Sequence, residues 1–177
     1  VWKAVCARRV YMLFSVAIYA VGIVAGSLIR IVPEIPINVT RLGTLEVFMN
    51  NVKVGIYLFL LGNVTFGIGN TGLLAFNGLV LGVSIRNVWH QYGLKPLVSG
   101  VLPHAPVEIA ATLICNTLGY ETVRVLRRIG RTSGMDGEPL IRLSEIVFLW
   151  VVAIVLFGIG AVIEGKISAA LVSEGVG

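Results

Sequence analysis

The sequence predicts an all-α integral membrane protein, a polytopic bundle of about five transmembrane helices that forms a single domain over residues 1–177. Composition is the first reason, because 56% of the residues are hydrophobic and only 13% are charged, with a mean hydropathy of +0.92. Soluble domains are about 45–50% apolar and about 25% charged. The second reason is that the apolar residues fall in runs of roughly the 20 residues that a spanning helix needs.

The first run extends from about Val10 to Ile29 and follows the basic residues Arg8 and Arg9. It exceeds the roughly 7–15 apolar residues of a signal peptide, so we interpret it as a true span. Gly22 and Gly26 form a GxxxG pair, which allows close helix packing. Alternatively, the pair reflects only the general abundance of glycine in membrane helices.

A loop is predicted over residues 30–46, where Pro33 and Pro36 disfavour a continuing helix. The segment Asn38-Val39-Thr40 matches a glycosylation sequon, which matters only in a secretory compartment.

Residues 54–89 are apolar almost throughout, and this 36-residue stretch is too long for one span. As a single helix it would measure roughly 54 Å, against a hydrocarbon core of about 30 Å. The glycines between Gly67 and Gly72 supply the backbone freedom for a reversal, so we expect a helical hairpin with short arms. The same letters spell GxGxxG, but neither a preceding strand nor a following ribose-binding acid supports a dinucleotide site.

Asparagine recurs every seven residues along this hairpin, at Asn63, Asn70 and Asn77. Buried amides of this kind hydrogen-bond across helices, for roughly 0.6–2 kcal/mol each. Asn63 and Asn77 could instead face each other across the hairpin.

The fourth apolar segment, residues 96–118, is interrupted by Pro103 and Pro106, and we expect a broken or re-entrant helix there. Residues 121–131 carry arginines at helical spacing, which is typical of an amphipathic helix on an anionic membrane surface. The last span is predicted over residues 146–163.

The basic residues favour a cytoplasmic N-terminus, since eight of the fourteen would then lie on the cytoplasmic side. They flank apolar runs rather than aromatic residues, so the net charge of +5 indicates lipid contact and not nucleic-acid binding. Cys6 and Cys115 are far apart without a CxxC partner and are predicted to be apolar packing residues.

The chemistry-bearing segment is Leu102-Pro103-His104-Ala105-Pro106-Val107-Glu108. If Pro106 lies in the first turn of a helix, His104 and Glu108 come close together near its start. Three interpretations stay open for this pair. It can be a structural ion pair, half of a divalent metal site such as zinc that another helix or another chain completes, or an acid–base pair. Arg86 closes the second hairpin arm, where its side chain can extend outward to the membrane surface, and neutralising Glu108 is its alternative role.

Several short motifs together resemble the stage II sporulation protein M (SpoIIM) family, in its archaeal and bacterial non-sporulation form. The motifs are Phe48-Met49-Asn50-Asn51, Phe66-Gly67-Ile68-Gly69, Phe76-Asn77-Gly78 through Gly82, and Leu102-Pro103-His104 with Glu108. One departure is that Pro106 stands upstream of Glu108, where the family usually has a proline after the glutamate.

The resemblance implies an all-helical multipass protein of the cell membrane. It also implies that Asn50, Asn51, Asn77, His104 and Glu108 form a functional polar cluster. The family namesake resembles a scaffold for partner enzymes, so we expect a scaffold or assembly factor that works as a homodimer and contacts protein partners in the lipid bilayer. No complete catalytic motif supports an enzyme, but an intramembrane metal-dependent enzyme or a small transporter that uses His104 and Glu108 is the alternative.

Overall fold

The computed structural model describes residues 2–29, 43–130 and 141–168, and every regular element in these ranges is a helix. Four helices are long and apolar enough to cross a membrane. They are α2 (Arg9–Leu28), α3 (Thr44–Val64), α4 (Ile68–Tyr92) and α8 (Leu143–Val162). The sequon, Pro33 and Pro36 lie outside the described residues.

A bent helix pair forms a fifth candidate span when its two parts are counted together. Its first part contains α5 (Leu94–Pro96) and a short π-helical segment, η1 (Leu97–Val101). Its second part contains α6 (Ala105–Leu118) and α7 (Glu121–Ile129), and the two parts meet at an angle of 57°. The expectation of about five spans, with a break near the two prolines, is therefore confirmed.

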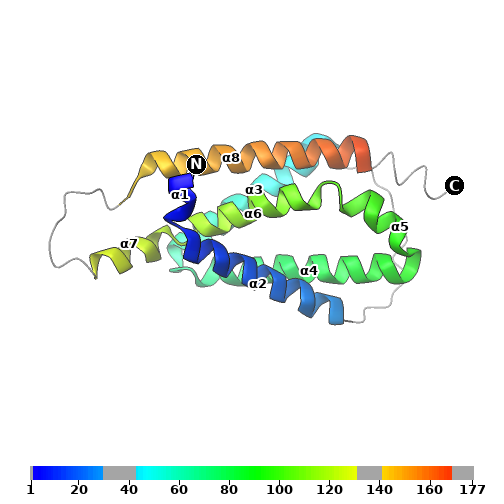
Figure 1. Cartoon of the computed structure of the whole chain (residues 1–177), viewed down its shortest axis with the longest axis horizontal. Coiled ribbons are helices and arrows are strands. Elements are labelled where there is room, and N and C mark those ends of the chain that lie inside the picture. Colours follow the sequence, from blue (N-terminus) through cyan, green and yellow to red (C-terminus); the bar gives the residue numbers. More distant parts are fainter. Residues whose placement is uncertain (1, 30–42, 131–140, 169–177) are drawn as a thin grey trace.

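The helices form an elongated bundle with two distinct ends (Figure 1). The short helix α1 (Trp2–Cys6), α7 and the start of α8 lie at one end. At the other end lie α5 and the end of α8, which continues into η2 (Ile163–Ser168). The chain thus places α1 and α7 at the opposite end of the bundle from α5.

The hairpin between α3 and α4 differs in detail from the prediction. The reversal occurs at Thr65–Gly67, where Phe66 and Gly67 have φ angles of 53° and 89°. Gly69 and Gly72 lie inside α4, and α3 begins at Thr44 rather than near residue 54. The arms are therefore 21 and 25 residues long, not short. Residues 44–53 did not resemble a span because several of them are polar. Those polar residues line a pocket, which is described below.

Glycines bring α2 and α4 into backbone contact. Gly22 and Gly26 on α2 face a second GxxxG pair, Gly78 and Gly82, on α4. A Cβ atom on Gly78 would lie 2.5 Å from the carbonyl oxygen of Tyr19, so only glycine fits there. The packing interpretation of the first GxxxG pair is confirmed.

The asparagines form hydrogen bonds between helices near the centre and the N-terminal end of the bundle. Asn63 donates to the Leu118 carbonyl at 3.0 Å and accepts from the Thr122 amide at 3.0 Å. Asn70, which is fully buried, donates to the Asn116 carbonyl at 2.9 Å. Hence these two amides join the hairpin to the α6–α7 segment, as the hydrogen-bonding interpretation predicts. Nδ2 of Asn77 has no partner among the described residues, so the proposed pairing with Asn63 is not supported.

An ion-pair cluster, which we call the charged clasp, closes the N-terminal end of the bundle. Arg8 is only 1% exposed and pairs with Glu121 of α7. Its Nη1 also donates to Glu145 of α8 at 2.8 Å and to the Ala4 carbonyl at 2.9 Å. Arg8 therefore ties three separate segments together. Of the two cysteines, Cys115 is buried as predicted, but Cys6 is exposed.

Candidate functional site

The opposite end of the bundle carries a polar pocket of about 620 Å³, between the first half of α3, the start of α6 and the end of α8. It is lined by Glu46, Val47, Met49, Asn50, Asn51, Lys53, His104, Glu108 and Glu164. We call this the polar pocket. Because polar side chains are costly in a membrane protein, such a concentration makes the pocket the candidate functional site.

His104 and Glu108 reach the polar pocket because a new helix begins between them. Pro106 occupies the first turn of α6, where a missing N–H costs little. The Glu108 amide donates to the His104 carbonyl at 3.2 Å, so the two residues lie one helical turn apart. The expected proximity of His104 and Glu108 is confirmed, and the shifted proline starts the helix rather than interrupting it.

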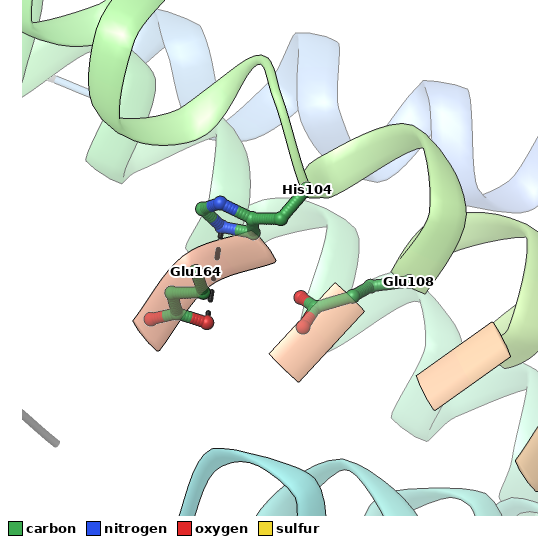
Figure 2. A group of neighbouring side chains, drawn as sticks. All are labelled: His104, Glu108 and Glu164. Carbon is green, nitrogen blue, oxygen red and sulfur yellow. Dashed lines mark ion pairs between the residues drawn. The ribbon is translucent and has the colours of Figure 1, made fainter. Parts of the chain in front are cut away.

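Glu164 completes the group, as Figure 2 shows. Its Oε2 atom lies 3.9 Å from Nε2 of His104, and one ligand-type atom from each of His104, Glu108 and Glu164 lies within 4.8 Å of the other two. Glu164 belongs to η2, at the end of the last span, more than fifty residues from the other two. Sequence reasoning did not select it. The available signal was a single acid that ends an apolar run.

Two further residues set the position of the Glu108 carboxylate. Nδ2 of Asn51, on α3, donates to Oε1 of Glu108 at 2.7 Å. Gly160, on α8, leaves room for the Glu108 side chain, since a Cβ atom there would lie 2.5 Å from Cγ of Glu108. The carboxylate is thereby held between α3 and α8.

The structure gathers most, but not all, of the predicted cluster. Asn50 and Asn51 line the polar pocket with His104 and Glu108, whereas Asn77 is not among its lining residues. Arg86 does not pair with Glu108, because its Nη1 donates to the Ser27 carbonyl at 2.7 Å. Arg86 instead lines a separate, mostly apolar pocket with Trp89 and His90.

The side chains of His104, Glu108 and Glu164 can either bind a metal ion or exchange protons. An imidazole and two carboxylates can bind a divalent metal ion, and the same groups can share protons. The side chain of His104 is 13% exposed and that of Glu164 is 35% exposed, so the group is accessible from the pocket.

Comparison with known proteins gives one family match. The model of the family described as stage II sporulation protein M matches residues 12–169. An uncharacterized protein of Methanocaldococcus jannaschii is 38% identical over 77 residues, which is 43% of this chain and 43% of that protein. The match thus spans less than half of that relative's length. No solved structure matches the chain.

Proposed function

Because the chain belongs to the stage II sporulation protein M (SpoIIM) family, we propose that it is a multipass protein of the cell membrane that acts as a scaffold or assembly factor. In this proposal the polar pocket is the surface that recognises a partner protein. The observation that carries it is the position of the polar pocket, which lies at one end of an otherwise apolar bundle and contains both hydrogen-bond donors and acceptors.

The internal contacts of the bundle favour a rigid bundle rather than a flexible one. The helices α2 and α4 meet backbone to backbone at four glycines. Asn63 and Asn70 tie the hairpin to the α6–α7 segment, and the charged clasp joins Arg8, the residue that precedes α2, to α7 and α8. A site held on rigid elements keeps its geometry, which suits a surface that positions another protein.

A site-specific photo-crosslinker tests the scaffold proposal. We expect a crosslinker at Lys53, an exposed residue of the polar pocket, to capture a protein of discrete mass in native membranes. The matched control is Val80, which is 45% exposed on α4 and lies outside the pocket lining. Equal capture from both positions, or no protein adduct from Lys53, would contradict the proposal.

We further propose that the protein works as a homodimer. The glycine and asparagine patterns that suggest association are largely used within one chain, so the dimer contact lies on other helix faces. Residues such as Leu13, Val21 and Ile154 expose apolar side chains there. Native mass measurement in mild detergent should give twice the 19.0 kDa of the chain. A mass corresponding to the monomer at all protein concentrations would contradict the proposed homodimer.

A second candidate function, an intramembrane metal-dependent enzyme, is favoured by one specific observation. His104 and Glu108, at the start of α6, and Glu164, at the end of the last span, converge on one point of the polar pocket. Three protein ligands leave a metal coordination position open for water or substrate, as in catalytic zinc sites.

A further inference from the structure

The geometry points to a binding site for one divalent transition-metal ion of the zinc type, formed by His104, Glu108 and Glu164. The inference rests on the proposed role of the polar pocket and names a ligand for it. Three observations support it. Three side chains that can ligate a metal converge, neighbouring residues position the Glu108 carboxylate, and the two carboxylates carry negative charge that a cation would compensate.

The donor set fits a transition metal better than magnesium or calcium. Imidazole nitrogen is a typical ligand of zinc, iron and nickel, whereas Mg²⁺ and Ca²⁺ sites are built from oxygen. Ligand atoms in a tetrahedral zinc site lie about 3.4 Å from one another. The three groups lie within 4.8 Å of one another, so small side-chain rotations bring them to that spacing.

Charge in the polar pocket also favours a cation. Glu108 and Glu164 bring two carboxylates close together in a partly buried position, where like charges repel each other strongly. Glu46 adds a third acid to the lining, and Lys53 is the one lysine or arginine among the described lining residues. A divalent ion between Glu108 and Glu164 would compensate both charges directly.

The surroundings of Glu108 are those of an oriented ligand. Asn51 donates to Oε1 of Glu108 at 2.7 Å and leaves Oε2 for another partner. Outer contacts of this kind fix the direction of a metal ligand, and their loss typically weakens metal affinity about 10–100-fold. Gly160 adds a steric condition, because any larger residue there would displace the Glu108 side chain.

The binding experiment uses the whole chain, purified in mild detergent and stripped of metal with a chelator. Zn²⁺ is titrated against a fluorescent zinc indicator, and bound metal is counted by mass spectrometry. We expect one Zn²⁺ per chain for the unchanged protein, not displaced by excess Mg²⁺ or Ca²⁺. His104→Ala, Glu108→Gln and Glu164→Gln should each weaken binding by more than Asn51→Ala, for which about 10–100-fold is expected.

Matched variants separate ligands from neighbours. Glu46→Gln removes an acid from the same pocket lining, and His90→Ala removes the other histidine of the chain. His90→Ala should leave the affinity unchanged within about twofold, whereas Glu46→Gln, which removes a nearby charge but no ligand, should weaken binding by less than Asn51→Ala does. Gly160→Ala should weaken binding, whereas Gly158→Ala on the same helix should not, because a Cβ atom at Gly158 finds its nearest neighbour 3.9 Å away.

Three results would overturn the inference. These are the absence of saturable one-to-one binding, unchanged binding in all three ligand variants, and equal losses in Glu46→Gln and Glu164→Gln. A misfolded variant is recognised by its elution and melting temperature, and the glutamine variants preserve side-chain size. The scaffold proposal fails separately. Zinc binding without a protein adduct at Lys53 would reject the scaffold and keep the metal site, and the reverse pattern would do the opposite.

Discussion

Arg8 shows how a single residue can differ in role from its immediate neighbour. Arg8 and Arg9 both precede the first span, but Arg8 is buried in the charged clasp while Arg9 is exposed. Removing one partner of a buried ion pair leaves the remaining charges with less compensation. In the clasp these are the carboxylates of Glu121 and Glu145, each of which also receives one further arginine.

Arg8→Ala should therefore destabilise the protein by about 3–5 kcal/mol, the usual cost of removing one partner of a buried pair. Arg9→Ala is the matched control and should change the free energy of unfolding by less than about 0.5 kcal/mol, as is usual for surface positions. Equilibrium unfolding in mixed detergent micelles measures both. Similar stabilities of the two variants would show that the clasp contributes little.

At the scale of helices, the contact between α2 and α4 depends on the absence of side chains. Apolar faces gain little by leaving lipid for protein, so close packing and backbone contact take a larger share of helix association. Gly22 and Gly26 lie against Gly78 and Gly82, with the two backbones in contact. Gly72, on the same helix α4, has no neighbouring atom of the described residues within 4 Å of its Cβ position.

Gly78→Ala should thus separate α2 from α4 and destabilise the bundle by about 1–3 kcal/mol, as overpacking usually does. Gly72→Ala should be neutral or stabilise the protein by up to about 1 kcal/mol, because alanine favours the helix. Thermal unfolding followed by circular dichroism compares the two variants. If Gly72→Ala proved as harmful as Gly78→Ala, helix packing would not explain the glycine requirement.

The whole molecule has an odd number of crossings when the bent pair counts as one span. The charged clasp, which includes α7, and the polar pocket, which includes Glu164 of η2, lie at opposite ends of the bundle, so we expect them on opposite sides of the membrane. Arg124, Arg127 and Arg128 belong to α7 at the clasp end, and the positive-inside tendency predicts a cytoplasmic position for that end. The proposed partner and metal ion would then approach from the outer side.

Cysteine labelling in intact cells with a membrane-impermeant maleimide tests this orientation. Cys6 is exposed at the clasp end and should stay unlabelled until the membrane is opened. Glu46→Cys, placed at the pocket lining in a Cys6→Ser background, should react in intact cells. Cys115 is buried and should not react in either state. Labelling of Cys6 in intact cells would reverse the orientation.

The candidate site was only partly predictable from local sequence. His104 and Glu108 are four residues apart around Pro106, and local helix geometry is enough to bring them together. Glu164 is far along the chain, and only the packing of α8 against α6 places it beside them. Asn77 belongs to the same family-like pattern but lies outside the polar pocket, because a shared motif does not fix the face on which a residue lies.

The sequence by itself determined the membrane class, a count of about four to five helices able to span a membrane, and the position of the helix breaks within a few residues. These follow from hydropathy, chain length and the backbone preferences of glycine and proline, all of which act locally. Only the tertiary structure decided which glycine pairs meet, that Arg8 is buried rather than exposed, and that Glu164 joins His104 and Glu108. Those outcomes depend on how each helix is rotated and which neighbour it packs against, and contacts between distant segments set both.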